Sequence, residues 1–132
     1  MSESTVVLVV DDHPDIREVV SLLLEHNGFH VQVARDGREA VEAVQRQRPD
    51  VILMDLAMPR MDGLTAARVL NEHDRCGIPI VAVTARAAPR EELEHAGFCG
   101  LLRKPVETGA LVRTIQACVE SQGHAPGWIG GA

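Results

Sequence analysis

Short apolar runs alternate along the chain with segments whose apolar residues recur at helical spacing. The first run, Val6–Val10, is continuous and apolar, as expected for a strand that is covered on both faces. A helix is predicted next, because Pro14 suits a first helical turn and Asn27 with Gly28 suits a helix end. Its apolar residues recur at helical spacing and form one stripe, which consists of Ile16, Val19, Val20, Leu23 and Leu24.

The same unit of a strand followed by a helix recurs four more times. The expected strands cover residues 29–34, 51–54 and 80–83, with a short last strand centred on Leu101 and Leu102. One expected helix begins at a capping box of Asp36 and Glu39. The other expected helices lie at about residues 62–73, at 89–97 and at about 107–120. Parallel strands need crossover helices, so this alternation predicts an α/β fold with helices on both faces of a parallel sheet.

The periodic pattern stops near Glu120. A chain of 132 residues suits a single domain, and we expect that domain to span residues 1–120. Residues 121–132 show no periodicity and are expected to form a flexible tail, in which Trp128 either docks or stays exposed. Met1 lies five residues before the first predicted strand, which favours a stand-alone domain.

Composition and charge exclude some kinds of binding partner and some cellular locations. Asp and Glu number 19 against 13 Lys and Arg, and the aromatic residues are two Phe and one Trp. An acidic, aromatic-poor chain argues against binding a nucleic-acid backbone or stacking on bases. The longest apolar runs are too short to span a membrane, and no secretory signal precedes them. The three cysteines lack metal-binding spacing, so we expect small buried or half-buried side chains in a cytoplasmic protein.

Polar residues follow four of the five predicted strands. Asp11 and Asp12 follow the first strand, Asp55 the third, Thr84 the fourth and Lys104 the fifth. Ligands of open α/β sheets bind outside the carboxyl ends of the strands, so these side chains are expected to converge there.

These residue types suit phosphoryl transfer to an aspartate. Three carboxylates without a thiol favour Mg²⁺ or Mn²⁺, ions that prefer oxygen ligands. Thr84 and Lys104 supply a hydrogen-bond donor and a positive charge for a phosphoryl group. A carboxylate can itself act as the nucleophile and form an aspartyl phosphate.

The motifs that carry this pattern are VVDD at residues 9–12, DLAMPRMDG at 55–63, VTA at 83–85 and KP at 104–105. With these motifs, the chain resembles a response-regulator receiver domain over nearly its whole length, from about Val6 to Glu120. The resemblance implies a doubly wound, flavodoxin-like sheet of five parallel strands in the order 2-1-3-4-5. It also implies a cis peptide bond before Pro105.

The resemblance further implies a function and a role for each site residue. Asp55 would be phosphorylated by a histidine kinase or a phosphotransfer protein, with Thr84 and Lys104 holding the phosphoryl oxygens. The metal ligands would be Asp11, Asp12, Asp55 and the backbone carbonyl of Ala57. Output would pass by protein contact through the fourth helix, fifth strand and fifth helix of a monomer or weak dimer. Such a domain is a signalling receiver that catalyses only its own phosphorylation and dephosphorylation.

The sequence departs from the receiver pattern at the switch position. Receivers usually carry Tyr or Phe three residues before the site lysine, and this chain has Leu101 there; Val106 replaces the usual Phe after Lys-Pro. We therefore expect the chemistry to survive and the readout by Thr84 and Leu101 to differ. Ala57 offers no polar group to orient water and Arg86 is a long cation near the pocket, so we expect slow hydrolysis of the phosphoaspartate.

Other interpretations remain open from the sequence. The chain could be a receiver-shaped scaffold that works without phosphorylation, or an aspartyl-nucleophile phosphatase, although the latter usually needs an acid where Ala57 stands. Asp11 and Asp12 could cap the first helix, and Thr84 could simply be a strand-end threonine. The six histidines are scattered, and only His13 lies beside the acidic residues.

Overall fold

Strands and helices alternate strictly in the computed structural model, which describes residues 5–56, 63–73, 77–85, 88–120 and 128–129. The strands are β1 (Val6–Val10), β2 (His30–Ala34), β3 (Val51–Asp55), β4 (Ile80–Thr84) and β5 (Phe98–Arg103). The helices are α1 (Pro14–His26), α2 (Gly37–Arg46), α3 (Gly63–His73), α4 (Arg90–Ala96) and α5 (Thr108–Glu120). All five predicted units are therefore present.

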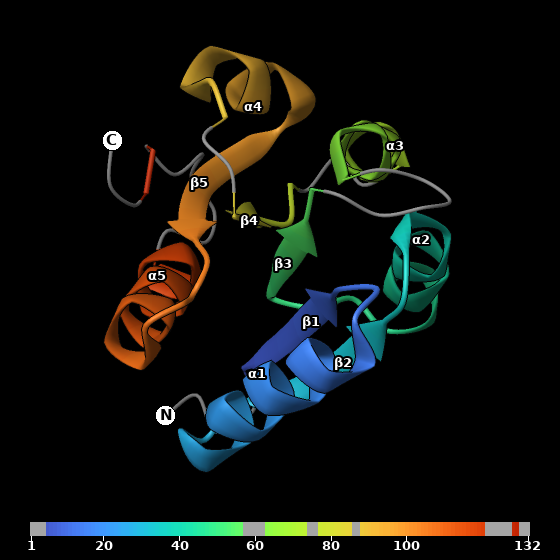
Figure 1. The fold of residues 1–132 in the computed structure, drawn as a ribbon. Coiled ribbons are helices and arrows are strands. Elements are labelled where there is room, and N and C mark those ends of the chain that lie inside the picture. Colours follow the sequence, from blue (N-terminus) through green and yellow to red (C-terminus); the bar gives the residue numbers. More distant parts are fainter. Residues whose placement is uncertain (1–4, 57–62, 74–76, 86–87, 121–127, 130–132) are drawn as a thin grey trace.

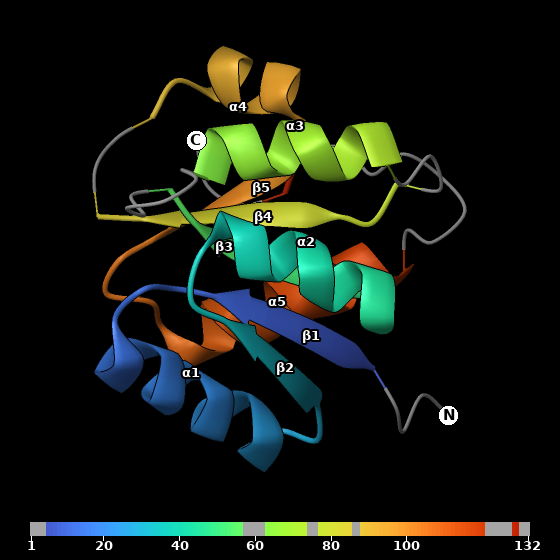
Figure 2. The same ribbon diagram turned by 90° about the vertical axis from the view of Figure 1, so that its right-hand side faces the viewer.

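The five strands form one parallel sheet in the order β2-β1-β3-β4-β5, which confirms the predicted fold (Figure 1). Figure 2 views this sheet from the side of α2 and α3, with α5 behind it. The same order brings the carboxyl ends of β1, β3 and β4 side by side, with β5 at the outer edge. Side chains on these ends can therefore meet.

Alternate strand residues feed two aliphatic clusters, one on each face of the sheet. Leu8, Ile52 and Ile80 point toward α2, α3 and α4, and we call this side the α2–α4 cluster. Val7, Leu53 and Val81 point toward α1 and α5, and we call this side the α1–α5 cluster. All residues of β1 and β3 are buried, as expected for strands with continuous apolar runs between two layers of helices.

The predicted helix is present as α1, but only part of its apolar stripe is buried. Leu24 is buried completely, but Ile16 is 39% exposed and Val19 is 56% exposed. The reason lies in the packing of α1, because a groove of about 590 Å³ remains between Ile16 and Val19 on one side and Val106 and Leu111 on the other. Periodicity identified the apolar face of the helix but not how much of it the sheet covers.

The predicted capping box of α2 is confirmed for the Asp36 cap, whereas the return hydrogen bond of Glu39 goes to Arg35, the residue before the cap. Oδ1 of Asp36 accepts the backbone N–H of Glu39 at 2.9 Å, and the Glu39 carboxylate accepts the backbone N–H of Arg35 at 2.8 Å. The Arg35 side chain also donates to Glu39, and this hydrogen bond lowers the pKa of the Glu39 carboxyl below its ordinary value. The carboxylate form of Glu39 therefore contributes to holding the start of α2.

Two of the three cysteines lie in the described part of the chain and are free thiols. Cys99 on β5 is half-buried and Cys118 on α5 is buried, as the sequence predicted. A hydrogen bond between the two sulfur atoms, together with burial, raises the pKa of Cys118 above its ordinary value. Among the described residues, no helix is long and apolar enough to cross a membrane.

Candidate functional site

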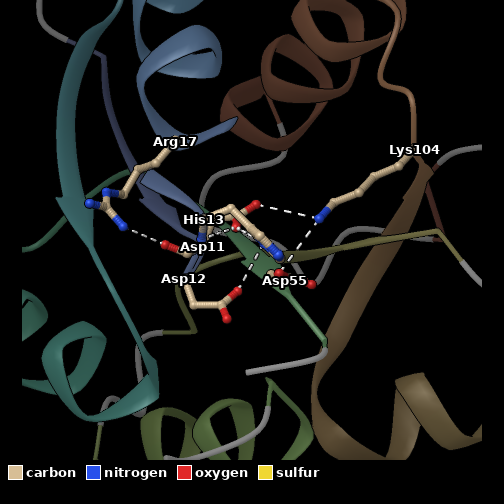
Figure 3. A network of polar contacts seen from close by, with 6 residues as sticks. All are labelled: Asp11, Asp12, His13, Arg17, Asp55 and Lys104. Carbon is tan, nitrogen blue, oxygen red and sulfur yellow. Dashed lines mark hydrogen bonds and ion pairs between the residues drawn. The ribbon is translucent and has the colours of Figure 1, made fainter. Parts of the chain in front are cut away.

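Acidic and basic side chains meet at the carboxyl end of the sheet (Figure 3). Asp11 directly follows β1, Asp55 is the last residue of β3, Thr84 is the last residue of β4 and Lys104 directly follows β5. Asp11, Asp55 and Thr84 follow or end strands whose residues are nearly all buried, whereas β5 before Lys104 alternates between buried and half-buried residues and ends on the exposed Arg103. The sheet order then brings these ends together.

Lys104 lies between two buried carboxylates. Its Nζ is 3.4 Å from Oδ2 of Asp11 and 3.5 Å from Oδ2 of Asp55. The two carboxylate side chains are only 7% and 5% exposed, while that of Lys104 is 19% exposed. Charges this close and this poorly hydrated interact strongly, so the ammonium offsets part of the repulsion between the carboxylates.

His13 contacts the acidic residues from the start of α1. Its Nδ1 lies 3.1 Å from Oδ1 of Asp11 and 3.1 Å from Oδ1 of Asp12, and its backbone N–H donates to Asp11 Oδ1 at 2.9 Å. His13 is the N-cap residue of α1 and its side chain makes no capping hydrogen bond, so Asp12 is not the N-cap. The interpretation of the acidic pair as a helix cap therefore fails for Asp12.

The donor set fits a divalent cation. Asp11, Asp12, His13 and Asp55 each offer a ligand atom, and these atoms lie within 4.8 Å of one another. Oδ1 of Asp12 is buried and accepts no hydrogen bond from the described part of the chain, although His13 Nδ1 is close. A buried carboxylate oxygen without a hydrogen-bond donor is a suitable ligand for a hard cation such as Mg²⁺.

Arg17 also contributes to the site, although no feature of the sequence singles it out. Its Nη1 donates to the backbone carbonyl oxygen of Asp11 at 2.8 Å, from the second turn of α1 (Figure 3). This contact fixes the path of the chain where β1 passes into α1. No motif marks it, because it depends on how far one side chain reaches back across the loop.

Three other predicted positions have different outcomes. Ala57 and Arg86 lie outside the described residues. Leu101 is half-buried in β5, where its side chain packs against the α2–α4 cluster and its backbone N–H donates to the carbonyl oxygen of Ile129 at 3.2 Å. The peptide bond between Lys104 and Pro105 is cis, as the resemblance implied.

Comparison with known proteins connects this geometry to a family. The profile of the response regulator receiver domain matches residues 7–116, which include all the site residues described above. The chain is 36% identical over 129 residues to the transcriptional regulatory protein CseB of Streptomyces avermitilis, covering 96% of this chain and 54% of that protein. The chain thus spans about half the length of this curated relative.

Solved structures share both fold and sequence with the chain. The chemotaxis protein CheY4 of Vibrio cholerae is 35% identical, with a TM-score of 0.82, 86% of this chain covered and 97% of that one. The receiver domain of the sensor histidine kinase PA1611 of Pseudomonas aeruginosa is 35% identical, with a TM-score of 0.82 and coverage of 89% and 99%. That structure has a magnesium ion coordinated in its active-site cleft.

Proposed function

This chain belongs to the response regulator receiver domain family, and we propose that it accepts a phosphoryl group on Asp55. The position of Lys104 carries the proposal, because its ammonium lies 3.5 Å from Asp55 Oδ2 and 3.4 Å from Asp11 Oδ2. A cation at this place can neutralise charge on a phosphoryl group attached to Asp55.

The reaction we propose is an in-line displacement at phosphorus. A carboxylate oxygen of Asp55 attacks the phosphorus of a phosphohistidine, the P–N bond breaks, and an aspartyl phosphate forms while the leaving imidazole takes a proton. Lys104 and the hydroxyl of Thr84 hold the phosphoryl oxygens. Asp55 is held by β3, whose burial fixes the nucleophile before the donor arrives.

Asp11, Asp12 and Asp55 would hold Mg²⁺ or Mn²⁺, together with the backbone carbonyl of Ala57. When bound, the ion would withdraw charge from the phosphoryl oxygens. Arg17 acts as a positioning residue, because its hydrogen bond to the Asp11 carbonyl fixes the loop that carries both acidic residues.

The phosphodonor we propose is a histidine kinase or a phosphotransfer protein that docks beside α1. Ile16 and Val19 are exposed on α1 and line a groove that also includes Asp11 and Lys104. An apolar surface that reaches Asp11 and Lys104, the two residues beside Asp55, is suited to a partner helix carrying the phosphohistidine. Output then passes through a second surface, formed by α4, β5 and α5, which we call the output face.

Incubation with Mg²⁺ and acetyl phosphate, followed by intact-mass measurement, tests the proposal. We expect the mass of one added phosphoryl group, and we expect Asp55→Asn to abolish it. Asp15→Asn is the matched control, because Asp15 is exposed in the first turn of α1 outside the acidic cluster. An adduct that survives in Asp55→Asn contradicts the assignment. The absence of both adduct and Mg²⁺ binding would favour a receiver-like scaffold, and continuous release of inorganic phosphate from monoesters would favour a phosphatase.

A further inference from the structure

Two residues near the end of the chain, Trp128 and Ile129, lie beside β5, and Ile129 forms an isolated β-bridge with it. The backbone N–H of Ile129 donates to the carbonyl oxygen of Cys99 at 2.8 Å, and the N–H of Leu101 donates to the carbonyl oxygen of Ile129 at 3.2 Å. These hydrogen bonds form a parallel bridge between Gly100 and Ile129, seen as the short red segment beside β5 in Figure 1. Since β5 is the outer strand of the sheet, the bridge covers an otherwise open edge.

The side chains of this segment are anchored on both faces of the sheet. Ile129 packs against the α1–α5 cluster, whereas Trp128 packs against the α2–α4 cluster. The guanidinium carbon of Arg90, the first residue of α4, lies 5.1 Å from the centroid of the Trp128 ring. Contacts between a cation and an aromatic face at this range are attractive. Both backbone hydrogen bonds and side-chain packing therefore hold residues 128 and 129 against β5.

Gly100 leaves the space that the segment uses. A Cβ atom at residue 100 would lie 2.5 Å from the backbone carbonyl oxygen of Ile129, a distance at which a backbone would have to move. Gly100 does not have a positive φ, so the backbone conformation does not require glycine. The close approach of Ile129 is a reason for glycine in the middle of an edge strand.

We propose that Trp128 and Ile129 form an intramolecular sixth strand that occludes the output face until a partner displaces it. The inference rests on the proposed function only in assigning output to this face. Addition of a strand to a sheet edge is a recognised mode of peptide binding, and here the chain supplies its own peptide. Any protein that uses the β5 edge must first break the two hydrogen bonds and the Trp128 contacts.

The docked segment is also joined to the switch position. Ile129 holds the backbone of Leu101, and Lys104 follows three residues later on the same segment of chain. A movement of β5 that accompanies a change at Lys104 would therefore strain the bridge. A readout that releases a strand would not need the aromatic ring that this chain lacks at position 101.

Hydrogen exchange on the full-length chain tests the proposal. The Leu101 amide should be protected, and Ile129→Pro, which removes the N–H given to Cys99, should raise its exchange rate by about tenfold or more. Gly100→Ala should do the same by excluding Ile129. Gly109→Ala is the matched control, because the nearest atoms to a Cβ there belong to the flexible Arg113 side chain and not to residues 128 and 129.

Fluorescence gives a second, independent measurement. Trp128 is the single tryptophan and the chain has no tyrosine, so its emission reports on this segment alone. Ile129→Pro and Gly100→Ala should shift the emission to longer wavelength and increase quenching by acrylamide, while Gly109→Ala should do neither. Full exposure of Trp128 in the unmodified chain, with the Leu101 amide unaffected by Ile129→Pro, would overturn the proposal.

The same samples separate this inference from the proposed function. An Asp55 adduct in a chain whose Leu101 amide is unprotected contradicts the sixth strand and leaves the phosphoacceptor role intact. A protected Leu101 amide that Ile129→Pro exposes, in a chain that forms no adduct, supports the sixth strand and contradicts the phosphoacceptor role.

Discussion

The backbone N–H of Lys104 donates to the carbonyl oxygen of Thr84 at 2.9 Å. This bond joins the last residue of β4 to the first residue after β5, so the two residues proposed to hold the phosphoryl oxygens share a fixed backbone spacing. Substitution of either side chain leaves the bond in place. The effects of such substitutions can therefore be attributed to the hydroxyl or ammonium group that is removed.

Lys104→Met should slow phosphorylation and strengthen cation binding. Loss of the ammonium should reduce adduct formation from acetyl phosphate by about tenfold or more, because charge on the transferred group is no longer offset. The same change should tighten Mg²⁺ binding several-fold, because a positive charge near Asp11 and Asp55 is lost. Intact mass and isothermal titration measure the two effects. Arg103→Met, at the exposed neighbour, should change neither effect. If Lys104→Met abolishes both phosphorylation and Mg²⁺ binding, the substitution has simply unfolded the chain.

Mg²⁺ should stabilise the folded chain through Asp12. At a concentration one hundred times its dissociation constant, an ion that binds only the folded state adds about 2.7 kcal/mol to the free energy of unfolding. The melting temperature should then rise by several degrees, and Asp12→Asn should remove most of the rise. Asp15→Asn should keep it, because Asp15 lies outside the acidic cluster. A rise that disappears in His13→Ala and persists in Asp12→Asn would contradict the carboxylate ligand set.

Ala57→Asn should shorten the lifetime of the phosphoaspartate. Alanine at 57 cannot orient an attacking water, whereas an amide can donate to or accept from one. We expect a lifetime of minutes or longer in the unmodified chain and a several-fold shorter one in the variant. Decay of the phosphorylated mass after removal of the phosphodonor measures both. A half-life of seconds that Ala57→Asn leaves unchanged would refute the idea.

The contribution of Glu39 to stability should depend on pH. Its hydrogen bond with Arg35 lowers the pKa of the Glu39 carboxyl from the ordinary value of 4.5, so the charged form is favoured in the folded state. The stabilisation is therefore complete above pH 4.5 and is lost as the pH falls through the lowered pKa. Urea unfolding should show Glu39→Gln to be less stable than the unmodified chain near neutral pH, with a smaller difference at about pH 3.

Two companion variants calibrate that measurement. Asp36→Ala removes the N-cap acceptor of α2 and should cost about 1 kcal/mol. Glu42→Gln removes one exposed carboxylate on the same helix, whose contact with Arg38 is a long 3.8 Å, and it is the control for a change in net charge. If Glu39→Gln and Glu42→Gln show the same pH dependence, net charge and not the Glu39 hydrogen bond is its cause.

The order of strands and helices was predictable because buried segments have characteristic patterns of apolar residues. Two-sided burial of β1 and β3 requires continuous apolar runs, and Asn27 with Gly28 ends α1 as expected. The strand ends were each predicted one residue short at Asp55 and Thr84. Both residues are polar, yet both still pair in the sheet, with Val83 and Arg103. The hydropathy of a side chain does not show whether its backbone is hydrogen-bonded in a sheet, so these two strand ends were missed.

The site was predictable as far as strand ends determine it. Asp11, Asp55 and Lys104 meet because parallel strands end at the same edge. The contacts of Arg17 with Asp11 and of Ile129 with Leu101 were not predictable, because they depend on side-chain reach and on a long-range approach of backbone. Neither leaves a periodic pattern.

The contact between Arg90 and Trp128 makes the stability of one helix depend on a distant segment. Of its seven residues, α4 buries only Leu93 and Ala96, so it gains little from the core. The contact of Trp128 with Arg90, the first residue of α4, is a second interaction that holds this helix. The α4 helix and the docked segment should therefore open together as one cooperative unit, and the amides of α4 should lose protection whenever Trp128 leaves the sheet edge.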